Sequence, residues 1–183
     1  MAVRAVPAPL AQLPNALTIF RFALIPVFCA MVLSTDGEGS YAAAGVFALA
    51  GVTDQVDGWL ARRWHVESRF GTFADPLADR LMIDAAVILL CLDGRLPWIA
   101  LAVILARDGA LVFGYPLVRG RGYEFEVNLL GKIATWVLYA ALVGVVASDE
   151  GTTWPLVLFW TGLALAVAAA VQYLFKAWRE VRR

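Results

Sequence analysis

Long apolar runs, each about the length needed to cross a membrane, constrain the fold of this chain most strongly. A membrane-spanning helix needs about 20 mostly apolar residues. Six runs meet this requirement, at 13–34, 40–61, 74–92, 96–118, 128–147 and 153–176. The composition agrees, because 61% of the 183 residues are hydrophobic and 16% are charged, with a mean hydropathy of +0.73, whereas soluble domains average about 45–50% apolar and about 25% charged residues. We predict an all-α integral membrane protein, a six-transmembrane-helix bundle that forms a single domain over residues 1–183.

Basic residues are divided unevenly between the two ends of the predicted bundle. One end carries ten of them: Arg4, Arg62, Arg63, Arg69, Arg119, Arg121, Lys176, Arg179, Arg182 and Arg183. The opposite end carries only Arg95, beside several acidic residues. Because basic loops stay on the cytoplasmic side, we expect both termini to be cytoplasmic, in a bacterial inner membrane or an organellar inner membrane. The formal net charge is zero, so a nucleic-acid partner is not expected.

Four aspartates lie where charged residues are costly. Asp54 and Asp57 end the second run, and Asp75 and Asp79 begin the third. Spacings of three and four residues place each pair on one helix face, and such clusters in a membrane mark functional sites. Four carboxylates at one depth repel one another unless cations compensate them. Oxygen donors without cysteine or a histidine pair favour Mg²⁺, Mn²⁺ or Ca²⁺, and two such ions can clamp a phosphoryl group.

Small residues beside these aspartates predict a smooth groove. Gly58 directly follows Asp57, Ala61 lies one turn further, and Gly71 lies four residues before Asp75. Glycine lets a ligand or a backbone approach closely, and Arg62 is placed to pair with phosphate. Two alternatives stay open at this point: the small residues are helix-packing positions, or the aspartates are solvated or paired with nearby arginines, namely Arg62, Arg63 and Arg80.

The aspartates and small residues form a motif that resembles the signature of the CDP-alcohol phosphotransferases. The motif reads Asp54-x-x-Asp57-Gly58-x-x-Ala61-Arg62, then eight residues, then Gly71-x-x-x-Asp75-x-x-x-Asp79. The first run is also similar to that family's first span, through Pro14-Asn15-x-Leu17-Thr18-x-x-Arg21.

The resemblance implies a homodimeric six-helix membrane enzyme that moves a phosphatidyl group from CDP-diacylglycerol to an alcohol and releases CMP. It implies that two divalent cations, Mg²⁺ or Mn²⁺, are bound by Asp54, Asp57, Asp75 and Asp79. It also implies that Asp79 is the general base on the acceptor hydroxyl and that Asp75 is catalytic beside it. The CDP-lipid-binding residues it implies are Gly58, Ala61, Arg62 and Gly71, together with Asn15 and Thr18 of the first run.

Two further segments bear on the acceptor, which we expect to be a glycerol-based lipid or alcohol. Phosphatidylglycerophosphate synthases typically have Ala-Arg-Glu and Gly-Lys-x-Lys-Thr, where this chain has Ala106-Arg107-Asp108 and Gly131-Lys132-Ile133-Ala134-Thr135. With Ala134 in place of the second lysine, the chain resembles cardiolipin synthases, which favours phosphatidylglycerol as acceptor; the alternative is a phosphatidylglycerophosphate synthase that uses glycerol 3-phosphate. The predicted acceptor pocket consists of Arg21, Arg107, Asp108 and Lys132. Arg107 and Asp108 are adjacent, so we expect each to have its own partner; a charge network between helices is the alternative role.

A different class of protein also places carboxylates in membranes. An ion-conducting or transporter bundle would spread acidic residues along a route through the membrane. The four aspartates instead lie at one predicted depth beside a basic loop, which favours a headgroup site. Asp84 has two open interpretations, as a support for the aspartate cluster or as a partner of Arg80.

Overall fold

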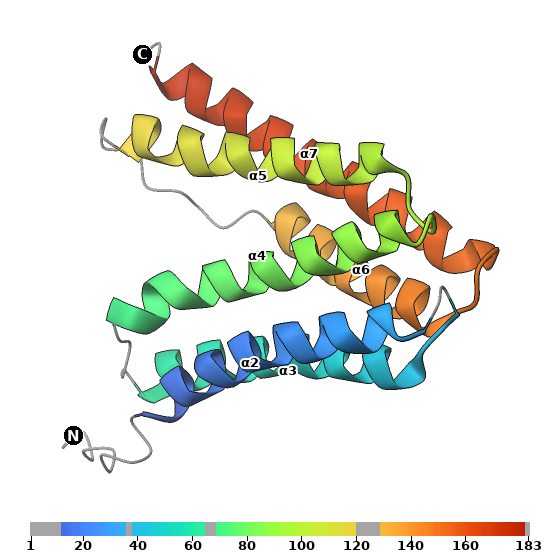
Figure 1. Ribbon diagram of the computed structural model, residues 1–183. Coiled ribbons are helices and arrows are strands. Elements are labelled where there is room, and N and C mark those ends of the chain that lie inside the picture. Colours follow the sequence, from blue (N-terminus) through green and yellow to red (C-terminus); the bar gives the residue numbers. More distant parts are fainter. Residues whose placement is uncertain (1–11, 36–37, 65–68, 120–128, 182–183) are drawn as a thin grey trace.

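The described part of this computed structural model contains six long helices and no strand, and covers residues 12–35, 38–64, 69–119 and 129–181 (Figure 1). Within the helices, the side chains of residues 14, 61–62, 69–73, 75–76, 111–119 and 176–181 are outside this description. The helices are α2 Leu13–Leu33, α3 Tyr41–Trp64, α4 Arg69–Leu92, α5 Trp98–Arg119, α6 Leu129–Ala147 and α7 Thr153–Val181. The all-helical prediction is confirmed.

Helix bounds differ from the predicted runs mainly at one end of the bundle. Helix α3 continues to Trp64, α4 begins at Arg69 rather than at 74, and α7 continues to Val181. The runs were defined by hydropathy, whereas a helix continues as long as its backbone bonds are satisfied. Polar turns therefore extend these helices beyond their apolar segments.

Three helices are long and apolar enough to cross a membrane in the part of the chain that the structure describes: Asn15–Leu33, Leu129–Ala147 and Thr153–Phe175. Helices α3 and α4 carry the aspartate motif, whose charges lower their hydropathy. Charged positions in such a bundle face its interior or a cavity. The chain is therefore a membrane protein whose charged helices depend on their neighbours.

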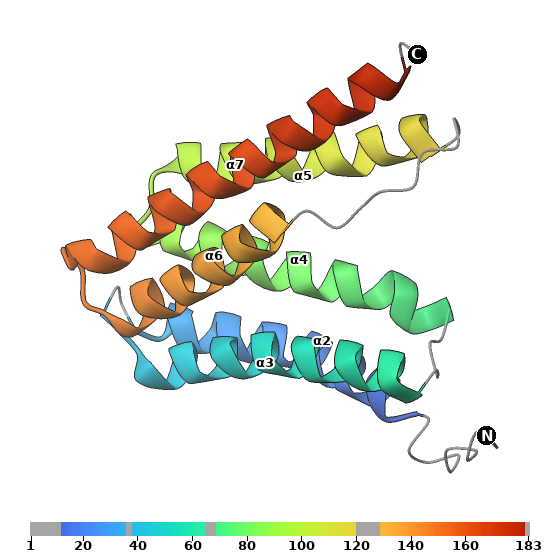
Figure 2. The same cartoon turned by 180° about the vertical axis from the view of Figure 1, so that it is seen from behind.

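Neighbouring helices pack against one another across the bundle. Helix α2 packs against α3 and α4, α3 packs against α6, α6 packs against α7, and α5 lies beside α7 (Figures 1 and 2). The start of α2, the end of α3, the start of α4 and the end of α7 lie at one end of the bundle (Figure 1). This arrangement brings the second half of α3 and the first half of α4, which carry the motif, to the same end.

Aromatic and small residues set the distances between the central helices. The ring of Phe47 on α3 lies 5.3 Å from that of Phe28 on α2 and 5.2 Å from that of Tyr139 on α6. On α6, a Cβ added at Gly144 would lie 2.7 Å from the Trp154 ring. The rings thus tie α2, α3 and α6 together, while glycine lets α7 approach α6 closely.

Loop contacts close the opposite end of the bundle. The Arg95 guanidinium donates hydrogen bonds to the carbonyls of Val145 and Ser148, at the end of α6. The backbone N–H of Ser40 donates to the Val146 carbonyl at 2.8 Å. Carbonyls in the last turn of a helix have no partner within it, so these donors from two other loops satisfy the end of α6.

Candidate active site

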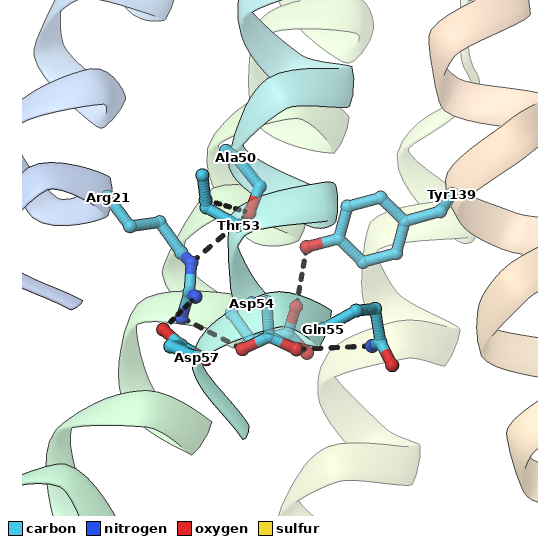
Figure 3. Close-up of polar contacts among 8 residues, drawn as sticks. Arg21, Ala50, Thr53, Asp54, Gln55, Asp57 and Tyr139 are labelled. Carbon is cyan, nitrogen blue, oxygen red and sulfur yellow. Dashed lines mark hydrogen bonds and ion pairs between the residues drawn. The ribbon is translucent and has the colours of Figure 1, made fainter. Parts of the chain in front are cut away.

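A buried arginine joins the two aspartates of α3. Arg21 on α2 is fully buried. Its Nη1 lies 2.8 Å from Asp54 Oδ1 and its Nη2 lies 2.6 Å from Asp57 Oδ2 (Figure 3). Its Nε donates to the Ala50 carbonyl at 3.2 Å. The planar guanidinium suits this bridging role. A positive charge from the protein itself therefore offsets part of the repulsion between the aspartates.

The two aspartates of α3 differ in exposure. Their spacing of three residues turns both toward Arg21, but the Asp57 side chain is 1% exposed and that of Asp54 is 23% exposed. Gln55 Nε2 donates to the second oxygen of Asp54 at 3.3 Å. Asp57 is thus buried beside Arg21, whereas Asp54 lines a cavity.

Of the three arginines in the alternative interpretation, Arg63 and Arg80 have described side chains, and neither forms an ion pair with an aspartate in the described part of the structure; the side chain of Arg62 lies outside the description. Arg63 lies over the ring of Trp59, with 5.5 Å between its Cζ and the ring centroid. No ion pair joins Arg80 to Asp84 among the residues that the structure describes. Arg21, from the preceding helix α2, is an observed partner of both Asp54 and Asp57.

Asp79 of α4 meets a residue that sequence reasoning missed. Tyr139 Oη donates a hydrogen bond of 2.5 Å to Asp79 Oδ1 (Figure 3). The spacing of Lys132, Thr135 and Tyr139, three and then four residues, places all three on one face of α6. That periodicity was the available signal, since Lys132 was already a candidate.

Two cavities meet at Asp79. The larger one, of about 660 Å³, lies between α3, α4 and α6; its polar lining includes Asp54, Asp79 and Lys132, and its apolar lining includes Val52 and Trp136. The smaller one, of about 260 Å³, lies between α4, α5, α6 and α7, and its polar residues are Asp79, Arg80, Arg107, Asp108 and Thr135. Asp79 and Thr135 line both cavities, so Asp79 lies between the two.

The four predicted acceptor residues are distributed over three places. Lys132 is exposed and lines the larger cavity, while Arg107 and Asp108 line the smaller one. Arg21 lies behind the α3 aspartates and lines neither cavity. The expectation of separate partners for Arg107 and Asp108 is wrong, because their side chains form an ion pair of 2.9 Å. The long arginine side chain folds back along the helix and reaches its neighbour.

Ala134 lies away from both cavities. Its side chain is fully buried in the apolar core. The position of the missing lysine therefore faces core rather than pocket in this chain. The alanine at position 134 therefore does not indicate how much positive charge an acceptor would meet in either cavity.

The remaining predicted residues are placed as follows. Thr18 is buried and Asn15 is half-buried, both on α2 before Arg21, and neither lines the two cavities. Gly58 is half-buried on α3. The side chains of Ala61, Arg62 and Asp75, and the surroundings of Gly71, lie outside the description.

Comparison with known proteins identifies the family to which this site belongs. Residues 11–171, which include the whole aspartate motif and both cavities, match the family described as CDP-alcohol phosphatidyltransferase. The chain belongs to the CDP-alcohol phosphatidyltransferase family. This membership makes it a transferase of phospholipid synthesis and favours an enzyme over an ion-conducting bundle.

Relatives of this phosphatidyltransferase are named for different acceptors. A Bacillus subtilis protein named CDP-diacylglycerol–glycerol-3-phosphate 3-phosphatidyltransferase is 31% identical, over 93% of this chain and 97% of its own. A Streptomyces coelicolor protein named cardiolipin synthase (CMP-forming) is 37% identical, over 91% of this chain and 74% of its own. Similarity over nearly the whole chain establishes the reaction class but not the acceptor.

The donor set of this phosphatidyltransferase fits hard divalent cations. Asp54 and Asp79 line one cavity, and their carboxylate oxygens are the ligands that Mg²⁺ and Mn²⁺ prefer. The side chain of Asp75, the remaining aspartate of α4 in the motif, lies outside the description. Among the described side chains, no group of three or more histidine, cysteine, aspartate or glutamate residues could hold a metal ion.

Proposed function

We propose that this enzyme transfers the phosphatidyl group of CDP-diacylglycerol to phosphatidylglycerol, forming cardiolipin and CMP. The observation that carries the proposal is the position of Asp79 at the junction of two cavities. In such a transfer, the group that removes the proton of the acceptor hydroxyl has to lie where this oxygen meets the donor phosphorus. The larger cavity has an apolar wall that includes Val52, Trp136 and Val143, which suits the acyl chain of a lipid.

In this proposal Asp79 accepts the proton of the acceptor hydroxyl while that oxygen attacks the phosphorus bonded to the diacylglycerol oxygen. The bond from this phosphorus to the CMP oxygen breaks, and CMP leaves with its electron pair. Proton removal by a placed carboxylate contributes about 10²–10⁴-fold in rate. No serine, cysteine or histidine nucleophile is needed, so one direct displacement is sufficient.

Donor binding in this proposal uses the rest of the motif. Gly58, Ala61 and Gly71 accommodate the cytidine and ribose, Arg62 binds the diphosphate, and Asn15 and Thr18 support this region from α2. Two divalent cations, Mg²⁺ or Mn²⁺, would neutralise the diphosphate and the departing CMP. The aspartates that would hold them are Asp54, Asp57, Asp75 and Asp79.

The charge of the smaller cavity supports a singly charged acceptor. Its lining contains two arginines, Arg80 and Arg107, and two aspartates, Asp79 and Asp108, so their formal charges cancel. Arg107 is already paired with Asp108. A phosphate monoester such as glycerol 3-phosphate carries up to two negative charges and gains little from such a lining, whereas the phosphodiester of phosphatidylglycerol carries one.

Glycerol 3-phosphate is the second candidate acceptor. The exposed ammonium group of Lys132 at the larger cavity favours it, since an ammonium group binds phosphate as a point charge. The name of the Bacillus subtilis relative also supports it.

We also propose the topology and assembly that the sequence predicted. The six helices span the membrane with both termini and the site on the cytoplasmic face, in a bacterial inner membrane or an organellar inner membrane, and the enzyme is a homodimer. The common position of the helix ends near the motif (Figure 1) and the ten basic residues assigned to that end support the orientation.

One assay tests the proposed function. The purified full chain is given CDP-diacylglycerol with Mg²⁺ or Mn²⁺, in parallel with phosphatidylglycerol, glycerol 3-phosphate and inositol phosphate, and the lipid product is identified by mass. We expect CMP and cardiolipin with phosphatidylglycerol. Phosphatidylglycerophosphate from glycerol 3-phosphate alone would contradict the acceptor and keep the reaction class. No CMP with any acceptor would contradict the proposed function as a whole.

A further inference from the structure

We propose that Tyr139 is a positioning residue that holds the Asp79 carboxylate at the junction of the two cavities. This inference rests on the proposed function, because it concerns the group that accepts the acceptor proton. Tyr139 is absent from the aspartate motif, and it belongs to a different helix.

The hydrogen bond between the two side chains is the first support. Tyr139 Oη donates this hydrogen bond to Asp79 Oδ1 from α6, a helix that carries none of the motif aspartates. Engaging Oδ1 fixes the rotation of the carboxylate and leaves Oδ2 to meet a substrate. Both residues line the larger cavity, so this contact lies where the chemistry would occur.

The surroundings of the tyrosine ring are the second support. Phe47 packs against the ring at 5.2 Å between centroids. On the same helix as Phe47, Gly51 lies so close that a Cβ there would be 2.8 Å from Tyr139 Cε1 and 3.0 Å from Cδ1. These contacts restrict the ring on the side that faces α3. Replacing Gly51 by alanine would push the ring, and with it the hydroxyl, away from its present place.

Two substitutions act on this contact in different ways, which makes the inference testable in the full chain. Tyr139→Phe removes the hydroxyl and keeps the ring. Gly51→Ala keeps the hydroxyl and displaces it. Tyr41→Phe is the matched control, because Tyr41 is 85% exposed at the start of α3. The measurements are kcat and KM for CDP-diacylglycerol, from CMP release, together with the thermal unfolding midpoint.

The expected result is a loss of kcat without loss of donor binding. Each of Tyr139→Phe and Gly51→Ala lowers kcat about ten- to a hundredfold, since a small misplacement of a reacting group has an effect of this order. KM for CDP-diacylglycerol changes less than about twofold, and Tyr41→Phe changes neither constant. The Gly51→Ala/Tyr139→Phe double variant loses about as much as the worse single variant, because both changes break one contact.

Different results would overturn different statements. Normal kcat in Tyr139→Phe, or a double variant whose loss is the product of the single losses, would contradict the role of Tyr139 alone. A rise of KM in step with a lower unfolding midpoint would show that Tyr139 only supports the fold. Absence of CMP release from the unaltered enzyme would instead overturn the proposed function, and the role of Tyr139 with it.

Discussion

Arg21 and Asp57 form an ion pair of 2.6 Å between α2 and α3, and both side chains are almost fully buried. Arg21 also contacts Asp54 at 2.8 Å, so one cation serves two carboxylates. Charges buried in this way are stable only while they are paired. The aspartates of the motif therefore depend on a helix that carries none of them.

Replacing Arg21 should destabilise the protein strongly. Arg21→Met keeps the length of the side chain and leaves two carboxylates without their cation, which costs about 3–5 kcal/mol for a buried pair. Arg63→Met is the control, since Arg63 is exposed and its contact with Trp59 is worth about 0.5–1 kcal/mol. Thermal unfolding in detergent measures both. Equal shifts in the two variants would contradict a structural role for the Arg21 pairs.

Replacing Asp79 should remove activity and keep the fold. Asp79→Asn retains an oxygen that can accept the hydrogen bond from Tyr139, so the unfolding midpoint should change little. CMP release should fall at least about a hundredfold, the lower limit for loss of a general base. Asp93→Asn, in the loop between α4 and α5 at the opposite end, should retain full activity. Near-normal turnover by Asp79→Asn would show that another group removes the proton.

Replacing Asp108 should shift the choice of acceptor. Asp108→Asn removes one negative charge from the smaller cavity and releases Arg107 from its ion pair. The rate with glycerol 3-phosphate relative to phosphatidylglycerol should rise about fivefold, which corresponds to about 1 kcal/mol. The assay is the product ratio when both acceptors compete, with the exposed Glu150→Gln as control. An unchanged ratio would show that the charge of this cavity does not determine which acceptor the enzyme uses.

A side chain at position 39 should destabilise the protein, because it would collide with the backbone of Ser148. A Cβ at Gly39 would lie 2.5 Å from the Ser148 carbonyl carbon, so one backbone would have to move. Gly39→Ala should cost about 1–3 kcal/mol, as overpacking does. Gly45→Ala on α3 meets nothing within 4 Å and should be neutral or stabilising by about 0.5–1 kcal/mol. Opposite shifts of the unfolding midpoint would support this contrast, whereas similar shifts would contradict it.

Arg95 should stabilise the folded protein by an amount that does not change between pH 6 and pH 9. Burial lowers the pKa of Arg95 below its ordinary value, and the carboxylates of Asp93, Asp149 and Glu150 oppose that change. A basic group with a lower pKa in the folded state binds fewer protons there, so stability rises with pH only near that pKa. Guanidinium groups stay charged in proteins.

The corresponding variant is Arg95→Gln, which removes a cation from the carbonyls of Val145 and Ser148. It should cost about 1–3 kcal/mol, and the difference from the unaltered enzyme should be the same at pH 6 and pH 9. Activity per folded molecule should not change, because the contact lies at the end of the bundle opposite Asp79. A difference that disappears at pH 9 would contradict a permanently charged Arg95.

Amino-acid sequence alone determined the helices and the reaction class, because both are encoded locally. Hydropathy over about 20 residues marks each helix to within a few residues, apart from polar turns such as the start of α4 at Arg69. The spacing of the aspartate motif within α3 and α4 identified the family. Both signals depend on residues that are close together in the chain.

Contacts between helices were decided only by the tertiary structure. The bridge from Arg21 to Asp54 and Asp57 was not predicted, and neither was the contact of Tyr139 with Asp79, 60 residues away. Arg107 reaches its neighbour Asp108 because its side chain is long and flexible. Which charged groups meet depends on how the helices rotate and pack against one another, and apolar periodicity specifies only that each helix buries a face, not which side chain of another helix it faces.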